Sequence, residues 1–207
     1  MIKWTIPKFV FSALFSALLL LPSSHAGAQK SDREGPLGLT WDASADQVRG
    51  LGGELKDLPK NDYGLSFVVT NLPRVLSDQE ATIVSFGYDD RLWRIVAVSK
   101  PFPDDPSGTN LKLRYQELMA TLTEKYGMPT SVHSLGDSIF QQPEYFLAGV
   151  KGGHTNWYSN FSTSTLSVQI NLSAEDSSTG RWRIIYEDKS LRKDFDVAKK
   201  AKEKSAL

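Results

Sequence analysis

Two acidic residues stand side by side in the segment GYDDRLWRIVAVS, residues 87–99. Asp89 and Asp90 precede Arg91 and Trp93, a combination that would suit two catalytic carboxylates beside an aromatic platform for a substrate. A paired-carboxylate enzyme, however, needs two acids that face each other across a cleft. Alternating apolar residues on both sides predict two strands, and aspartate tolerates the conformations that turns require. The segment therefore predicts a hairpin with Asp89 and Asp90 in a tight turn.

The other residues that do chemistry form no recognisable set. His133 and His154 lie twenty-one residues apart, and neither has a partner at the spacing of metal ligands on a helix or a strand pair. The chain has no cysteine, which excludes thiol nucleophiles and sulfur ligands. It also lacks the nucleophile elbow of serine hydrolases and the His-Glu-x-x-His motif of zinc proteases. The sequence predicts no catalytic residue, no metal and no cofactor.

A glycine-rich stretch, GVKGGHTNWYS, covers residues 149–159. It lacks the Gly-Lys-Ser/Thr end of a phosphate loop, and it precedes a predicted strand, whereas phosphate loops open helices. We interpret it as a loop. Because loops often carry binding residues, Lys151, His154 and Tyr158 are the candidate binding cluster. The glycine-rich composition favours the alternative interpretation, in which this stretch is a mobile loop that leads into a hairpin and has no binding role.

The first 28 residues have the three parts of a secretory signal peptide. Lys3 and Lys8 precede an apolar run over residues 9–21, and an A-x-A pattern ends at Ala28. Spanning a bilayer takes about 20 apolar residues, and this run is shorter. We expect cleavage after Ala28, or alternatively after Ala26, no membrane span, and a soluble protein that is periplasmic or secreted.

Charge and size narrow the classes of partner. Without residues 1–28 the chain carries 22 basic and 24 acidic residues, so nothing favours binding to nucleic acid or to an anionic surface. The remaining length of about 180 residues suits one sizeable domain or two small ones. Without disulfides, the hydrophobic core alone must hold the fold.

Two helices are predicted from capping and periodicity. Ser44 and Gln47 have the spacing of a capping box, so a two-turn helix should follow Ser44, with Val48 and Leu51 on one face. An amphipathic helix of about four turns is predicted over residues 111–126. Gly127 should end this second helix in a left-handed cap.

Strict alternation of apolar and polar residues predicts the strands. In the segment TLSVQINLS we expect one set of side chains in the core and the other in solvent. The core set is Leu166, Val168, Ile170 and Leu172, and the solvent set is Ser167, Gln169 and Asn171. The other predicted strands are 65–70, 82–88, 92–99, 157–161 and 181–187. One covered and one wet face is typical of antiparallel sheets, so the predicted class is α+β, an antiparallel sheet packed by helices.

The order of a helix followed by strands occurs twice. LWRIVAVS and RWRIIYED occupy similar places after a turn, and three prolines in the linker KPFPDDPSGTN mark a boundary. We expect a degenerate tandem repeat of one helix-plus-strands unit. The predicted domains are residues 1–28 as signal peptide, 36–100 and 108–188 as the two units, and 189–207 as a C-terminal helix or tail.

Two segments carry a resemblance to known families. GLTWDASADQVRGLGG resembles the opening helix of SmpA/BamE envelope modules and of the β-lactamase-inhibitor-protein (BLIP) type fold, in which short helices cover an antiparallel sheet. YQELMATLTEKYGMP is similar to the way helices end before strands in these families. The chain departs from both patterns, because it has neither the lipid-bearing cysteine of BamE-like lipoproteins nor the disulfides of BLIP domains. The resemblance implies an architecture and a habit of binding proteins, and it assigns no site residue.

Three classes of function are compatible with the sequence. The first is a non-catalytic periplasmic module that binds another envelope protein, as an inhibitor, an immunity protein or an assembly factor. The second is a small-ligand or lipid-binding envelope protein with a pocket between the helix at residues 111–126 and the sheet. The third is a hydrolase that uses His133 or His154. The lack of a catalytic motif and the abundance of aromatic residues, which dominate interface energetics, favour the first class.

Overall fold

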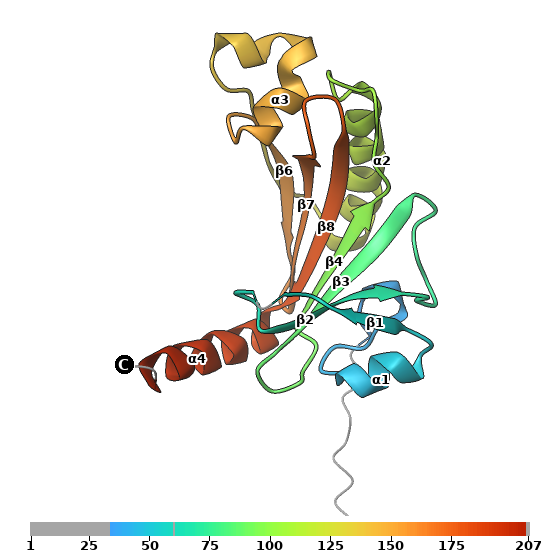
Figure 1. The fold of residues 1–207 in the computed structure, drawn as a ribbon, viewed down its shortest axis with the longest axis vertical. Helices are drawn as coiled ribbons and strands as arrows, with labels where there is room; N and C mark the ends of the chain where they lie inside the picture. Colours follow the sequence, from blue (N-terminus) through green and yellow to red (C-terminus); the bar gives the residue numbers. More distant parts are fainter. Residues whose placement is uncertain (1–33, 60, 206–207) are drawn as a thin grey trace, which may run out of the picture. The chain divides into compact units, whose positions relative to one another are not determined.

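The structure is a computed structural model that describes residues 34–59 and 61–205. The predicted signal peptide, residues 1–28, lies outside the described residues. The described residues belong to one compact unit. Its centre is a single antiparallel sheet of eight strands accompanied by helices (Figure 1), which confirms the α+β class.

Each half of the described chain contains an α-helix and four strands that follow it, and in the second half a further short helix separates the first of these strands from the other three. The first half contains α1 (Ala45–Gly50), β1 (Glu54–Asp57), β2 (Leu65–Thr70), β3 (Gln79–Gly87) and β4 (Arg94–Ser99). The second half contains α2 (Thr109–Tyr126), β5 (Thr130–Ser134), α3 (Phe146–Lys151), β6 (Asn156–Ser162), β7 (Leu166–Ala174) and β8 (Gly180–Asp188). A last helix, α4 (Lys189–Ser205), follows β8 directly.

The strand order relates the two halves to each other. The sheet runs β1-β2-β3-β4-β8-β7-β6-β5, so the last strand of each half meets its counterpart in the middle. The first strand of each half forms an outer edge. An approximate twofold relation between β4 and β8 would produce this order. The topology is compatible with a tandem repeat, while the duplication and the unit boundaries at 36–100 and 108–188 stay predictions.

Helix α2 packs on one face of the sheet, against β6, β7 and β8. Its buried residues recur at the spacing read from the sequence: Leu111, Tyr115, Leu118 and Leu122. The buried carboxylate of Asp105 begins this helix by accepting hydrogen bonds from the backbone N–H groups of Thr109 (2.7 Å) and Leu111 (3.0 Å). On β7, Val168, Ile170 and Leu172 are buried and Leu166 is partly buried against the core, which confirms the predicted inward face. On the other face Ser167 is exposed, as predicted, whereas Gln169 and Asn171 are only partly exposed.

The β3–β4 hairpin answers the question raised by the two adjacent aspartates. The two strands pair in antiparallel register, which confirms the hairpin. The connection is longer than a tight turn, because β3 ends at Gly87 and β4 begins only at Arg94. Asp90 has a left-handed conformation with φ of 51°, which aspartate tolerates better than most residues. Trp93 is only 1% exposed and stacks on Phe195 of α4 at 4.6 Å, so it is a core residue.

The structure corrects several predicted boundaries. Helix α1 has the predicted capping box, but Leu51 follows its last residue and is 46% exposed. Strand β3 begins at Gln79 rather than Thr82, and β4 begins two residues later than predicted. Strands β1 and β5 and helix α3 were not predicted from the sequence. The C-terminal segment is helical through Ser205, with Leu191 and Phe195 buried, because these two side chains pack onto the end of the sheet.

Over residues 34–59 and 61–205, none of the helices combines the length and the apolar character that crossing a membrane requires.

Candidate functional site: the open face of the sheet

The strands between the two edges of the sheet have one face in the core and one face on the opposite side, which we call the open face. Cross-strand register shows which residues share it. Val68 of β2 lies opposite Ile83 of β3, which lies opposite Val96 of β4. Val96 in turn lies opposite Ile185 of β8. These four residues form an unbroken row across four strands, which we call the apolar row.

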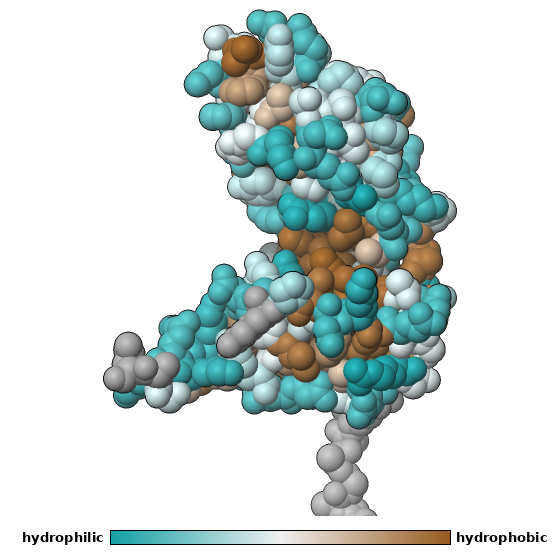
Figure 2. All heavy atoms as spheres, viewed as in Figure 1, coloured by the Kyte–Doolittle hydropathy of each residue, from teal (hydrophilic) through white to brown (hydrophobic). Residues whose placement is uncertain are grey.

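The apolar row is separate from the hydrophobic core. Val96 is only 4% exposed, yet it does not belong to the cluster of core residues, because its neighbours in the chain, Ile95 and Ala97, point into that cluster instead. The other three members of the row are partly exposed. Figure 2 shows hydrophobic surface over the middle of the sheet, above β1 and β2. The open face therefore presents apolar side chains where an antiparallel sheet usually meets water.

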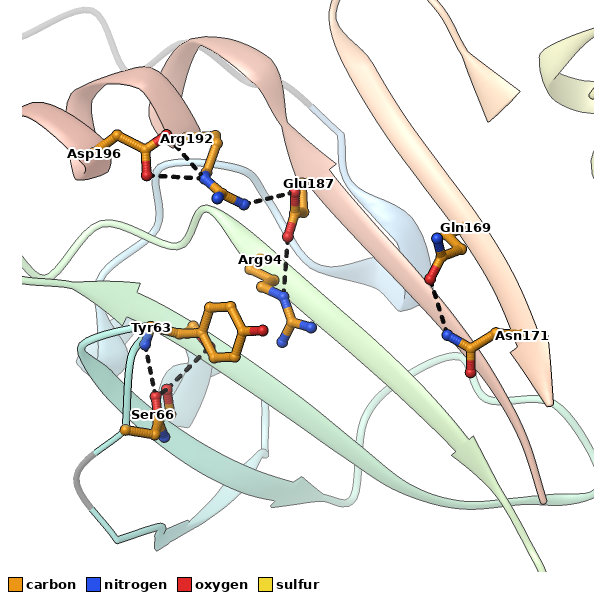
Figure 3. A network of polar contacts seen from close by, with 10 residues as sticks. Tyr63, Ser66, Arg94, Gln169, Asn171, Glu187, Arg192 and Asp196 are labelled. Atoms are coloured by element: carbon orange, nitrogen blue, oxygen red, sulfur yellow. Dashed lines mark hydrogen bonds and ion pairs between the residues drawn. The ribbon is translucent and has the colours of Figure 1, made fainter. Parts of the chain in front are cut away.

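Beyond Ile185 the same row becomes polar. Gln169 of β7 lies opposite Ile185, and Asn160 of β6 lies opposite Gln169. The Nε2 atom of Gln169 donates to Oδ1 of Asn160 at 2.8 Å. The Nδ2 atom of Asn171 donates to Oε1 of Gln169 at 2.9 Å (Figure 3). This ladder of amides fixes the side chains on β6 and β7, because each amide is oriented by its neighbour.

A second polar group lies at the other end of the open face. The guanidinium of Arg94 lies over the ring of Tyr63 at 4.1 Å, and its Nε donates to Glu187 of β8 at 3.0 Å. Glu187 also accepts from Arg192, which in turn binds Asp196 on α4 (Figure 3). The arginine, the acid and the aromatic ring hold one another in place, so this end of the face is rigid and internally neutralised.

Arg183 is different from every other arginine in residues 34–59 and 61–205. The other seven each lie within 4.0 Å of a carboxylate oxygen, whereas Arg183 has no such partner. Its Nε donates to Oδ1 of Asn171 at 3.2 Å, at one end of the amide ladder. Loss of surrounding water and the positive charge of Arg94 lower the pKa of the Arg183 guanidinium below its usual value.

A groove of about 490 Å³ opens beside Arg183, between the end of α3 and strands β6, β7 and β8. Lys151, the last residue of α3, lines this groove, and so does Tyr158 of β6. Tyr158 lies opposite Asn171, which lies opposite Arg183, so the three occupy neighbouring positions on adjacent strands. The groove is lined by two cations and by no carboxylate.

Of the predicted cluster of Lys151, His154 and Tyr158, the structure brings the first and the last to one groove. His154 does not line it, because its ring stacks on Phe140 at 4.6 Å, on the other side of the loop. The loop interpretation also needs correction. Lys151 is helical and Tyr158 is in a strand, so both are held by regular structure and only residues 152–155 form the loop.

His133 belongs to a polar cluster beneath α2. The Oη atom of Tyr115 lies 3.2 Å from Nε2 of His133 and 2.6 Å from Oγ of Ser159, which lies 2.5 Å from Oγ of Ser131. The His133 ring also stacks on Trp157 at 4.3 Å, and burial lowers its pKa. Because Ser159 is 0% exposed, a substrate has no access to this hydroxyl. The cluster satisfies buried polar groups between α2 and the sheet.

Sequence reasoning missed Arg183, although a signal for it exists. The alternation that places Trp182 and Ile184 in the core places Arg183 on the wet face of the last strand. This alternation does not show which residues surround Arg183 in the folded chain. Arg181, two residues earlier, pairs with Glu80 and Glu175, and only the folded arrangement shows that Arg183 has no acid beside it.

Within the part of the chain that the structure describes, no group of three or more histidine and acidic side chains is placed to hold a metal ion. Comparison of the chain with protein-family models, with curated proteins and with solved structures finds no significant match.

Proposed function

We propose that this chain is a non-catalytic protein-binding module of the cell envelope and that the open face is its contact surface. The observation that carries the proposal is the apolar row of Val68, Ile83, Val96 and Ile185, set in register across four strands on the face away from the core. An apolar centre without a covering helix is typical of surfaces that bind another protein.

The surroundings of the apolar row support this proposal. Tyr63 and Arg94 lie at one end, and Tyr158 and Arg183 lie on the second-half strands. Tyrosine and arginine are enriched where interfaces gain most of their energy. Because the row lies on hydrogen-bonded strands, its side chains are held in place before a partner arrives, which lowers the entropic cost of association.

The sequence supports the proposed compartment. The segment at residues 1–28 has the pattern of a secretory signal peptide. An exported partner is therefore expected, and an inhibitor, an immunity protein or an envelope-assembly factor are the forms that this role takes. The two cations that line the groove, Lys151 at the end of α3 and Arg183 on β8, favour a partner whose contact surface combines an apolar centre with acidic residues at its edge.

The alternative of a ligand pocket beneath α2 has less support. The residues of α2 that face the sheet are 0–6% exposed, and the hydroxyl of Tyr115 is bonded to Ser159, so side chains fill this interface. The alternative of a hydrolase would place a histidine beside a carboxylate in a cleft. Instead, His133 faces a tyrosine hydroxyl and a tryptophan ring.

Site-specific photocross-linking tests the proposal. A photoreactive amino acid replaces Ile185 on the open face or, as a matched control, Leu113, which is 58% exposed on α2. In cells that express the chain, we expect a cross-linked adduct of defined mass from position 185 and none from position 113. The partner is then identified by mass spectrometry and purified.

Binding of the purified partner gives the quantitative test. Ile185→Glu should weaken binding at least about tenfold, since it places a charge in the centre of the contact, whereas Leu113→Glu should leave it unchanged. Adducts that form equally from both positions, or binding that survives Ile185→Glu, would remove the open face as the contact surface.

A further inference from the structure

We infer that the groove beside Arg183 is a binding site for an oxyanion, a carboxylate or a phosphate group, held chiefly by the Arg183 guanidinium with Lys151 as the second cation. This inference stands apart from the proposed protein-binding role, because a free anion can occupy the groove whether or not the apolar row binds a protein.

The first argument is the missing counter-ion. Among the arginines that the structure describes, Arg183 alone lacks a carboxylate within 4.0 Å, and the groove beside it is lined by no acid. The Arg183 side chain is exposed, so its unpaired charge is open to a ligand. An oxyanion bound in the groove would give it the counter-ion that the other seven described arginines already have.

The second argument is that the two terminal nitrogens of the Arg183 guanidinium, which form a donor fork, are not used within the described residues. Nε of Arg183 is used by Asn171, which fixes the direction of the side chain. Within the described residues, its two terminal nitrogens, Nη1 and Nη2, donate to no acceptor. A planar pair of parallel N–H groups matches the two oxygens of a carboxylate or a phosphate. The amide ladder from Asn160 through Gln169 to Asn171 orients this fork in advance.

The third argument is the convergence of other donors. Lys151 comes from the end of α3 and Tyr158 from β6, and both line the groove that Arg183 enters from β8. Tyr158 makes no side-chain hydrogen bond within the described residues, so its hydroxyl is available to a ligand. Three donors from α3, β6 and β8 thus reach one groove of about 490 Å³.

Two sources would supply the oxyanion, and two probes distinguish them. Inorganic phosphate represents a small free anion, and N-acetylglutamate amide represents an acidic side chain of a partner protein. Each is titrated into the purified protein at constant ionic strength while the Nε–Hε signals of the arginines are followed by NMR. We expect a saturable shift of the Arg183 signal with at least one probe, and the tighter probe identifies the source.

Variants make the assignment specific. Arg183→Gln should remove saturable binding, and Lys151→Gln should weaken it several-fold, because a charge-assisted contact is lost. Arg183→Lys, which keeps the charge but not the fork, should bind roughly tenfold more weakly. His154→Gln is the matched control, since His154 lies in the same loop region without lining the groove.

The competing explanation is general screening of a surface charge. It predicts a shift that does not saturate and that Arg49, an exposed arginine paired with Asp46, shows to the same extent. That result with both probes would overturn the inference. Because Lys151 is exposed at a helix end, its variant should fold normally, so the test holds even if Arg183→Gln does not fold. Either result leaves the cross-linking test at position 185 unaffected.

Discussion

The Oδ1 atom of Asp90 accepts a hydrogen bond from the backbone N–H of Ala45 at 3.0 Å. This bond joins the β3–β4 connection to the first residue of α1, across 45 positions of sequence. Ser44 and Gln47 satisfy other groups at the same helix end through their capping box. Asp90 thus supplies an acceptor to a helix end whose remaining N–H groups need partners.

Asp90→Ala should lower the free energy of unfolding by about 1–2 kcal/mol, because the Ala45 N–H loses its acceptor and alanine is disfavoured at a positive φ. Asp90→Asn keeps an oxygen acceptor and tolerates this backbone, so it should stay near the wild type. Asp89→Ala is the control, with a change within about 0.5 kcal/mol. Urea denaturation measures all three, and an equal loss for Asp89→Ala would contradict the assigned role of Asp90.

The inward face of β7 gives a test of register. Val168 is 1% exposed, so Val168→Asp buries an unpaired charge and should cost several kcal/mol, on the order of 3 or more. Gln169→Asp changes the open face and should cost less than about 1 kcal/mol, through loss of its bond to Asn160. Thermal and urea unfolding should separate the two variants clearly. Similar losses of stability would mean that the strand is not in this register.

Asp78 connects the two halves of the chain. It lies in the β2–β3 connection and accepts from Nε and Nη2 of Arg114 on α2, both at 2.8 Å, and from the indole N–H of Trp182 on β8 at 2.9 Å. Burial raises the pKa of the Asp78 carboxyl, but the bonds from Arg114 and Trp182 together lower it below its ordinary value.

Asp78→Ala should therefore destabilise the fold by about 2–3 kcal/mol, because a buried indole and a guanidinium lose their shared acceptor. Glu117→Ala removes the other acid that Arg114 contacts, but this pair is exposed and three residues apart on one helix, so it should cost less than about 0.5 kcal/mol. Paired urea denaturation curves provide the comparison. A cost for Glu117→Ala as large as that for Asp78→Ala would show that Asp78 is not the link.

His133 should make stability depend on pH. Burial lowers its pKa in the folded state, so the unfolded chain takes up a proton first as the pH falls below about 6.5. The free energy of unfolding should therefore fall as the pH drops from about 7.5 to 5.5, and His133→Gln should reduce this slope. The control variant His154→Gln should keep the part of the pH dependence of the free energy of unfolding that is due to His133. Denaturation midpoints across this range would decide the matter, and an unchanged slope in His133→Gln would exclude this histidine as its source.

The local sequence was sufficient to predict the helices and strands whose buried residues recur at a regular spacing. The three- and four-residue spacing of Leu111, Tyr115 and Leu118 is a property of one helix, and the alternation around Val168 and Ile170 is a property of one strand. Both patterns follow from the geometry of a single segment, so they can be recognised without knowledge of the rest of the chain.

The elements that the sequence did not reveal have a common physical cause. Strands β1 and β5 are the two edges of the sheet, and most of their side chains are exposed on both faces. Backbone hydrogen bonds to one neighbouring strand hold them, and such bonds leave little trace in side-chain hydrophobicity. Helix α3 has only six residues, too few to display a helical period clearly.

The candidate site depended on the tertiary structure throughout. The sequence singled out Lys151 and Tyr158 but not Arg183, and it also included His154, whose ring turns to Phe140. The sequence alone thus determined the fold class and the inward and outward faces of the main strands, because these follow from periodicity within a segment. Only the fold decided that Val68, Ile83, Val96 and Ile185 form one row and that Arg183 has no acid beside it, because register and contact join segments far apart in the chain.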